Sequence, residues 1–159
     1  MIIRPALPGD LEAIMNIYEK ARAFMRSTGN KTQWTNGYPQ KEILEDDIKK
    51  GELFVCETDE VHAVFAFILG GDKTYNYIEN GSWLSDTPYG TIHRVASDGA
   101  QKGIMGEITS FCEKTAKHLR IDTHADNKVM RRALEKNGFS KRGIIYLEDG
   151  SPRLAFEKL

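Results

Sequence analysis

The chain has 159 residues, of which 40% are hydrophobic and 28% are charged, and its formal net charge is −1. That length suits one domain with a sizeable core, and we expect a single domain over residues 1–159. The balanced charge gives no general attraction to nucleic acid or to an anionic membrane, and no apolar run approaches the ~18 residues of a membrane span.

The cysteines and histidines also limit the function classes. Cys56 and Cys112 form no CxxC motif, which favours free thiols in a reducing compartment such as the cytoplasm. The histidines show no HExxH or His/Cys spacing, so the sequence predicts no metal site. The first residues lack the basic-then-apolar order of a signal peptide.

The first predicted elements are a short strand and two helices. An apolar strand at residues 2–4 is ended by a proline. Asp10 is placed to cap a helix over residues 11–25, whose apolar side chains recur at helical spacing. A polar loop at residues 27–39 leads to a second, acidic helix over residues 41–50, which a glycine ends.

The middle of the chain is rich in strand formers. Residues 53–58 and 61–69 read as two strands of a hairpin joined by Asp59 and Glu60. After a break at two glycines, partial alternation predicts another strand at residues 75–83.

A strand, a glycine-bearing loop, a helix and a second strand follow in that order. They are predicted at residues 91–96, 97–106, 107–118 and 119–123. A strand–helix–strand unit of this kind joins two parallel strands by a right-handed crossover.

The last part of the chain predicts a helix over residues 127–136, ended by a left-handed cap at Gly138. Two final strands follow at residues 139–146 and 153–157, joined by a turn. A strand-rich opening followed by strand–helix–strand–helix–strand–strand predicts a mixed α/β sheet, of α+β type.

The loop before the third helix is a candidate phosphate-binding site. Gly103 and Gly106 let backbone approach a ligand, the helix start offers N–H groups and positive potential, and Gln101 and Lys102 add donors. A plain turn with glycines for tight packing explains the same residues, and both interpretations stay open.

A second group of polar residues precedes the last helix. Asn127 is placed to cap that helix, and Gly138 suits its end. A capped helix does not explain why the preceding loop also holds His124 and Asp126.

The order and separation of these two motifs resemble the GCN5-related N-acetyltransferase (GNAT) superfamily, which transfers an acetyl group from acetyl-CoA to an amine. In that family a strand leads into a pyrophosphate loop of the form R/Q-x-x-G-x-G/A and then a helix. A later Asn-led helix ends in Asn/Leu-Gly-Phe, as residues 127–139 do here. Residues 2–11 also look like the family's opening strand and helix start.

The resemblance implies a GNAT-like acyl-CoA acyltransferase fold: a central, mostly antiparallel sheet with a parallel splayed pair at its centre and helices on both faces. It implies an acetyl-CoA-dependent N-acetyltransferase, with acetyl-CoA as co-substrate and no metal, acting on a primary amine of a small molecule by direct attack. The family commonly dimerises, which leaves open a homodimer paired through residues 153–157.

Three positions depart from the family pattern. Ala100 stands where Arg or Gln is usual, Met105 where the second small residue is usual, and Leu134 where a Tyr often acts as general acid. Two alternatives therefore stay open: a CoA-binding, sensor-like or partner-binding module with weakened catalysis, and an acyltransferase acting on a protein amine.

The resemblance also implies roles for backbone groups. The N–H of Val95 maps to the group that holds the thioester carbonyl oxygen, both as oxyanion contact and as part of the cofactor site. Asn127 maps to a contact with the pantetheine or phosphate arm. The pyrophosphate maps to main-chain groups of Gln101, Lys102, Gly103, Ile104, Met105 and Gly106.

A general base is expected on the strand before the loop. In a regular strand His93 shares one face with Thr91 and Val95, and it is the residue there whose pKa is ordinarily near neutrality. A half-buried histidine bonded to backbone is the alternative, and many family members deprotonate the amine through water. His124 and Glu79 are the reserve candidates.

The acid and the acceptor pocket are less defined. Tyr146 or water would protonate the departing thiolate, or no acid acts at all. An acidic residue beside aromatics suits a cationic amine, although ordinary packing of aromatic side chains is the alternative for each of them. The candidate pocket residues are Trp34, Tyr38, Glu79, Trp83 and Tyr89.

Overall fold

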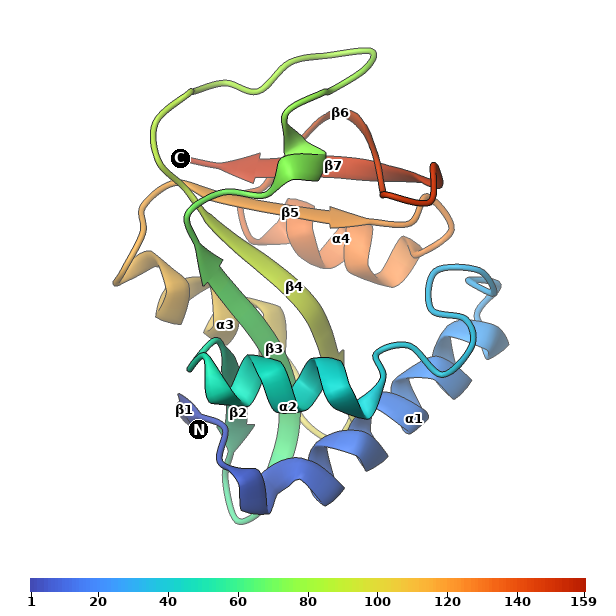
Figure 1. The fold of residues 1–159 in the computed structure, drawn as a ribbon, viewed down its shortest axis with the longest axis vertical. Helices are drawn as coiled ribbons and strands as arrows, with labels where there is room; N and C mark the ends of the chain where they lie inside the picture. The colour runs from blue at the N-terminus through green and yellow to red at the C-terminus, as the bar shows by residue number, and fades with distance from the viewer. The chain divides into compact units, whose positions relative to one another are not determined.

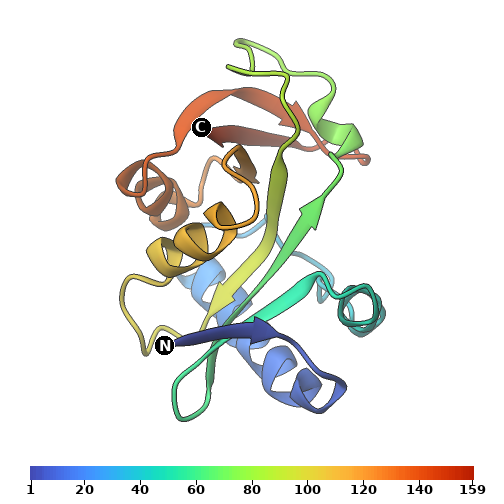
Figure 2. The ribbon, with the colours of Figure 1, turned by 90° about the vertical axis from the view of Figure 1, so that its left-hand side faces the viewer.

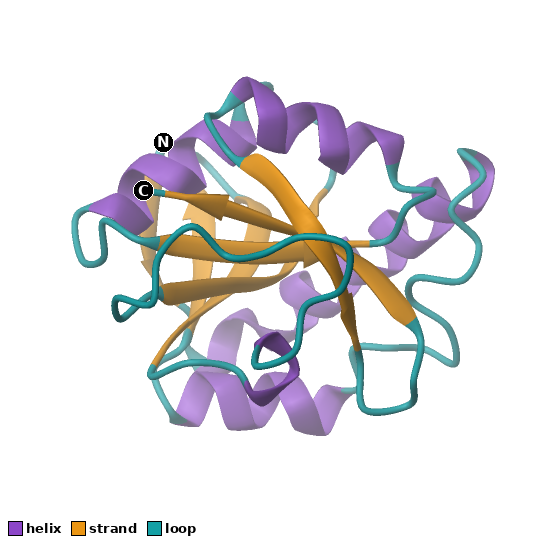
Figure 3. Cartoon of the chain, turned by 90° about the horizontal axis from the view of Figure 1, so that it is seen from above, coloured by secondary structure: helices purple, strands orange, loops and turns teal.

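A computed structural model describes all of residues 1–159. Long loops connect several of the elements, and they are drawn in teal in Figure 3. The elements, in chain order, are β1 (Ile2–Pro5), a 3₁₀ turn η1 (Pro8–Asp10), α1 (Leu11–Ser27), α2 (Lys41–Lys49), β2 (Leu53–Glu57), β3 (Val61–Leu69), a 3₁₀ turn η2 (Lys73–Tyr75), β4 (Gly90–Ser97), α3 (Ile104–Glu113), β5 (Leu119–Thr123), α4 (Lys128–Lys136), β6 (Ser140–Tyr146) and β7 (Pro152–Lys158).

The chain divides into two compact units. Unit 1 contains Met1–Phe67 and His93–Ile104, and unit 2 contains Ile68–Ile92 and Met105–Leu159. Strand β4 begins in unit 2 and ends in unit 1. The single domain expected over residues 1–159 stays a prediction. No helix is long and apolar enough to cross a membrane.

The strands form one seven-stranded mixed sheet in the order β1-β2-β3-β4-β5-β7-β6. The pairs β1–β2, β2–β3, β5–β7 and β6–β7 are antiparallel, and β4–β5 is parallel. This confirms the predicted mixed, mostly antiparallel sheet with a central parallel pair. The β4–β5 pairing consists of Gly90 with Leu119 and Thr91 with Arg120, although β5 continues against β7 as far as Thr123.

In unit 1 helices α1 and α2 cover one face of β2, β3 and β4. The periodic apolar residues of α1 face inward, and α2 crosses in front of the strands in Figure 1. Because α1 repeats its apolar side chains at helical spacing, one stripe of it is buried. The buried cluster consists of Ala6, Ile14, Ile17, Tyr18, Ala21, Leu44, Leu53, Val55, Val64, Ala66 and Ala96.

In unit 2 the segment between β3 and β4 is not the predicted strand. Residues 75–83 form no ladder, apart from one isolated bridge between Glu79 and Ile144 of β6. The Trp83 indole N–H donates to the Tyr75 carbonyl at 2.9 Å, so the segment curls back on itself. The aromatic residues whose spacing suggested a strand instead anchor the segment, because Tyr75 and Trp83 pack with Ile145 and Ala155. Figure 2 shows this segment on one side of the unit's strands and α3 and α4 on the other.

The last helices and strands correct two further expectations. Helix α3 spans Ile104–Glu113, whereas residues 107–118 were predicted, because the left-handed Gly103 (φ +74°) lies just before the first turn. Strand β7 lies between β5 and β6, so both of its edges are already paired. Pairing of residues 153–157 across a dimer interface is therefore wrong as a route to a homodimer.

A buried carboxylate links four parts of unit 2. Glu157 Oε2 lies 2.6 Å from His118 Nε2 and accepts from Arg120 Nε at 3.2 Å, while Oε1 accepts the Leu84 N–H at 2.6 Å. The Arg120 guanidinium lies 4.0 Å from the ring centres of both Trp83 and Tyr89. A buried charge is tolerated when it is paired and hydrogen-bonded on every side, as here.

We expect Glu157→Gln to destabilise the protein by about 3 kcal/mol, because it removes the charge that compensates a buried guanidinium. Urea denaturation followed by circular dichroism measures this change. Glu135→Gln, at an exposed position of α4, is the matched control and should stay within about 0.5 kcal/mol of wild type. Equal midpoints for the two variants would contradict the assignment of Glu157 as the central ion of unit 2.

In unit 1 a histidine–aspartate pair fixes the end of β4. His62 Nδ1 lies 2.8 Å from Asp98 Oδ2, and the Asp98 N–H donates to the His62 carbonyl at 3.0 Å. This hydrogen bond to Asp98 raises the pKa of His62 above its ordinary value, against the effect of burial. Asp59, with Oδ1 at 3.5 Å from Nε2, and Glu60 also favour the protonated ring.

We predict a pH-dependent contribution of His62 to folding. Its folded pKa is raised, so the contribution is fully present below the unfolded pKa of about 6.5 and is lost as pH rises through the higher folded pKa. The loss of unfolding free energy in His62→Gln should therefore be larger at about pH 5.5 than at about pH 9. Denaturant titrations of both proteins at the two pH values check this, and an equal loss at both would show a purely neutral contact.

Candidate functional site

Strand β4 carries an unusual backbone conformation. Arg94 has φ +52°, in the left-handed region that non-glycine residues rarely adopt, and it lies in the interior of the strand. Regular alternation therefore does not run unbroken from His93 to Val95, although the prediction of a shared face rested on it. Both His93 and Val95 are half-buried in unit 1.

Three groups of unit 1 hold Arg94. The Tyr18 hydroxyl donates to its carbonyl oxygen at 2.6 Å. Its Nε and a terminal guanidinium nitrogen lie 3.0 and 2.8 Å from Asp47 Oδ2, and its other terminal nitrogen lies 3.5 Å from the Tyr38 hydroxyl. Burial raises the pKa of Asp47, against the effect of Arg94.

Asp47 corrects the sequence interpretation of α2. An acidic run such as residues 42–47 is ordinarily a solvated helix face, yet Asp47 is only 5% exposed. The position of Asp47 in the helix could have predicted its burial. It follows the fully buried Leu44 by about one turn and directly precedes the half-buried Ile48. Nothing in the sequence marked Tyr18 or Arg94 as more than a core and a strand residue.

The loop after β4 is built as a turn. The Asp98 carboxylate accepts the Ala100 N–H at 2.8 Å, and Gly99 and Gly103 both have positive φ, +80° and +74°. A Cβ on Gly103 would meet no atom within 4 Å, so space lies beside this backbone. Lys102 is exposed and Gln101 is half-buried.

Helix α3 starts directly after Gly103, so Ile104, Met105 and Gly106 form its first turn. The side chains of Ile104 and Met105 are 8% and 6% exposed. Burial of these side chains explains why Met105 is tolerated where a small residue is usual, since what a phosphate would meet there is backbone. The first N–H groups of a helix have no intrahelical acceptor, and a loop of this form fits a phosphate group.

Asn127 caps α4, as predicted. Its side-chain oxygen accepts the Met130 N–H at 3.0 Å. In the same loop His124 Nδ1 accepts the Asp126 N–H at 3.0 Å, and burial lowers the pKa of His124. The contact of Asn127 with a cofactor arm stays a prediction. Leu134, on the same helix, is fully buried.

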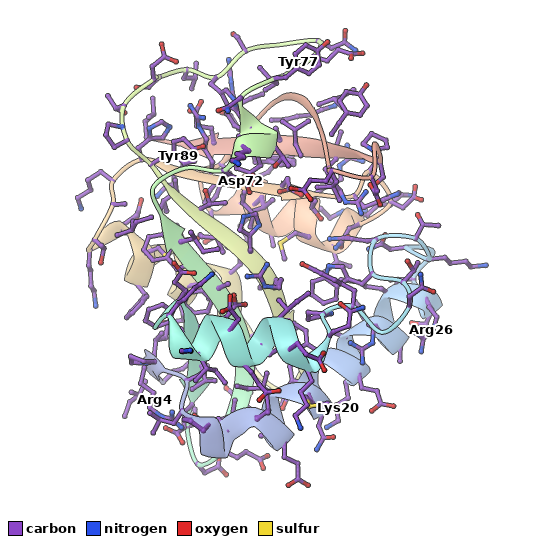
Figure 4. All side chains as sticks on the ribbon, in the orientation of Figure 1. Arg4, Lys20, Arg26, Asp72, Tyr77 and Tyr89 are labelled. Carbon is purple, nitrogen blue, oxygen red and sulfur yellow. The ribbon has the colours of Figure 1, made fainter.

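A carboxylate and two tyrosines meet in unit 2. The hydroxyls of Tyr146 and Tyr77 donate to Glu79 Oε2 at 3.1 and 3.3 Å, and their ring centres are 6.5 Å apart. The hydrogen bond to Glu79 raises the pKa of Tyr146, so this hydroxyl keeps its proton more firmly than an ordinary tyrosine. Tyr77 is 63% exposed, and Figure 4 shows it on the segment between β3 and β4.

The other aromatic pocket candidates have packing partners within their own units. Trp34 packs edge-on against Tyr18 at 5.6 Å, and Tyr38 lies 6.2 Å from Trp34. The Tyr89 hydroxyl accepts the Asp72 N–H at 3.0 Å, and the two residues are neighbours in Figure 4. These contacts give each residue an anchoring role, whereas any contact with an acceptor stays a prediction.

The predicted site residues fall into two sets. Unit 1 contains His93, Val95, Gln101, Lys102, Gly103, Ile104, Trp34 and Tyr38. Unit 2 holds Met105, Gly106, Asn127, Glu79, Tyr89 and Tyr146. The sequence predicted the glycine-bearing loop and the Asn127 cap. It named Glu79 and Tyr146 for separate roles, and it missed Tyr77 beside them and the groups that hold Arg94.

Comparison with known proteins identifies the family. No protein-family model matches the chain, and no curated protein sequence matches it. A GNAT family acetyltransferase structure from Streptococcus agalactiae 2603 is 32% identical, with a TM-score of 0.90 over 99% of this chain and 94% of that chain.

Two further structures share the fold at lower identity. A GNAT family acetyltransferase from Listeria monocytogenes 4b F2365 is 18% identical, with a TM-score of 0.72 over 99% of this chain and 93% of that one. An N-acetyltransferase from Staphylococcus aureus Mu50 is 20% identical, with a TM-score of 0.62 over 99% and 96%.

The Streptococcus agalactiae structure matches this chain in sequence, in fold and over nearly the full length of both proteins. The resemblance seen in the sequence is thereby confirmed. The chain belongs to the GNAT family of acetyltransferases, whose members use acetyl-CoA as acetyl donor.

Proposed function

We propose that the protein transfers the acetyl group of acetyl-CoA to the primary amine of a small, cationic molecule by direct attack of the neutral amine. The observation that carries the acceptor class is the group of Glu79, Tyr77 and Tyr146, in which one carboxylate oxygen accepts hydrogen bonds from two tyrosine hydroxyls. In this proposal the carboxylate attracts an ammonium group by charge, and the nearby aromatic rings add cation–π contact.

Acetyl-CoA binding is supported by the loop before α3. The open space beside Gly103 and the first turn of α3 suit a pyrophosphate, held by the main chain of residues 101–106. In this proposal Asn127 contacts the pantetheine or phosphate arm, and the Val95 N–H donates to the thioester oxygen as it gains negative charge.

The amine must lose a proton before or during attack. His93 on β4 is the proposed base, directly or through water, because its side chain ordinarily titrates near neutral pH. The Tyr146 hydroxyl is the proposed donor to the departing thiolate, with water as the alternative. Its proton is presently donated to Glu79.

A protein amine is the alternative acceptor. A ribosomal-protein-alanine N-acetyltransferase from Brucella melitensis has the same fold at 17% identity. A protein described as a phosphinothricin N-acetyltransferase has it at 19% identity. At these identities the likeness concerns the fold alone. The small-molecule proposal rests on the charge of Glu79 and its two tyrosine partners.

The surroundings of the two cysteines support a cytoplasmic location. Cys56 and Cys112 are both free and buried, which suits a compartment where thiols stay reduced.

Calorimetric titration with acetyl-CoA, with CoA alongside, tests the donor. We expect micromolar binding, and about tenfold weaker binding for Gly103→Ala, because alanine strains a backbone at φ +74°. Gly51→Ala is the matched control, since Gly51 has φ +71° and open space outside the loop. No binding of acetyl-CoA at millimolar concentration would overturn the proposal.

A screen of small primary amines and of peptides with free N-termini, with detection of released thiol, tests the acceptor. We expect cationic small amines to react, and Glu79→Gln to raise KM about tenfold or more while calorimetric acetyl-CoA affinity stays unchanged. Reaction of the peptides alone would replace the small-molecule acceptor with a protein amine.

A further inference from the structure

The strain at Arg94 is stabilised by buried partners. A non-glycine residue in the left-handed region costs free energy and persists only where its surroundings hold it. Tyr18 is 1% exposed and Asp47 is 5% exposed, so both contacts to Arg94 are largely shielded from water. Burial raises the pKa of Tyr18, so its hydroxyl keeps its proton and remains a donor near neutral pH.

The Tyr18 contact acts on one peptide plane. Its hydroxyl donates to the Arg94 carbonyl oxygen at 2.6 Å. That oxygen and the Val95 N–H belong to the same planar trans peptide, in which C=O and N–H point in opposite directions. Because Tyr18 comes from α1, the hydrogen bond turns the Val95 N–H away from α1.

The Arg94 side chain provides a second anchor at the Cα that begins this peptide plane. Its guanidinium is held at 3.0 and 2.8 Å by a single oxygen of Asp47 on α2. The residue is thus fixed through its carbonyl by one helix and through its side chain by another. The Tyr18 hydrogen bond opposes a change in the tilt of the following peptide, and the Asp47 contact holds the Arg94 side chain.

We propose that Tyr18 is a positioning residue for acetyl transfer, which aims the Val95 N–H at the thioester oxygen through the Arg94 carbonyl, with Asp47 holding Arg94 in the required conformation. The inference rests on the proposed oxyanion role of Val95. Stabilisation of developing charge depends on the direction of the donor, so a small rotation of this peptide lowers kcat rather than affinity for the substrate.

A measurement that needs no acceptor amine tests whether the Val95 N–H points at the thioester oxygen. Isotope-edited infrared spectroscopy of acetyl-CoA labelled with ¹³C at the thioester carbonyl reports how strongly that carbonyl is polarised in the bound state. We expect a lower carbonyl frequency on wild-type protein and a clearly smaller shift on Tyr18→Phe, with calorimetric affinity for acetyl-CoA unchanged. With an amine from the screen, kcat should fall about tenfold at unchanged KM.

Tyr75→Phe is the matched control. Tyr75 is a buried tyrosine of unit 2 whose hydroxyl lies 2.7 Å from Asp122 Oδ2, so this variant also removes one buried hydrogen bond. It should lower thermal stability as Tyr18→Phe does but keep the full carbonyl shift. An unchanged shift and kcat in Tyr18→Phe would make its contact purely structural and overturn the inference.

Substitution at Arg94 separates backbone positioning from a direct role of its charge. Glycine adopts φ +52° without strain, whereas alanine keeps the strain and lacks the anchor to Asp47. We expect Arg94→Gly to retain more of the carbonyl shift and of kcat than Arg94→Ala. Equal losses in both variants would assign the effect to the guanidinium and overturn positioning through the backbone.

The wild-type measurements keep the two proposals distinguishable. If wild-type protein binds no acetyl-CoA and releases no thiol, the proposed function fails before any variant is compared. If it binds acetyl-CoA without shifting the carbonyl frequency, the oxyanion role of Val95 fails, and the inference about Tyr18 fails with it.

Discussion

The left-handed backbone at Arg94 is the constraint on which the centre of the sheet depends. Up to Thr91 strand β4 pairs with β5 in parallel, and at Arg94 the carbonyl is instead bonded to a tyrosine of α1. A buried backbone carbonyl needs a hydrogen-bond donor, and at Arg94 the Tyr18 hydroxyl supplies it. Helices α1 and α2 therefore do more than cover an apolar face, since each contributes one buried polar side chain to β4.

In unit 2, side-chain contacts hold the irregular segment between β3 and β4. The residues between β3 and β4 form almost no backbone ladder, so their position depends on the Glu157, Arg120 and Trp83 contacts and on the bridge between Glu79 and Ile144. Such a network keeps an irregular segment in one conformation, because lifting the segment would remove the Leu84 N–H from Glu157 and the Ser85 carbonyl from Arg120. The carboxylate of Glu79 thus reaches Tyr146 from a segment without regular structure.

The sequence predicted the secondary structure correctly where local signals and tertiary packing favour the same element. The hairpin of β2 and β3, the parallel pair β4–β5 and the Asn127 cap all follow from periodicity, β-branched runs and turn residues, and each was found as predicted. The start of α3 was misplaced because two glycines, Gly103 and Gly106, could each end the loop. Only Gly103 has positive φ, whereas Gly106 is helical, with space for a Cβ limited by Asn137 at 3.0 Å.

Residues 75–83 and the Arg94 cluster could not be predicted, for a shared physical reason. Aromatic residues at short intervals are as compatible with a strand as with anchors of a curled loop, and only the tertiary partners of Tyr75 and Trp83 decide between them. The conformation of Arg94 is likewise paid for by residues distant in sequence, Tyr18 and Asp47. Local patterns carry no record of such partners.

The buried Leu134 bears on which steps of the proposed reaction need help from a protein group. The family often has a tyrosine there as acid for the thiolate, and here that position is an apolar core residue. A thiol ionises at a pKa of about 8.5, so a thiolate can depart near neutral pH with little help from an acid. The amine must lose a proton and the carbonyl oxygen must gain negative charge, and both of these changes are unfavourable near neutral pH without help from the protein. In the proposed reaction the chemical demand therefore falls on the base and on the oxyanion contact. The proposal assigns the second task to the peptide between Arg94 and Val95, whose carbonyl and preceding side chain are both held by buried partners.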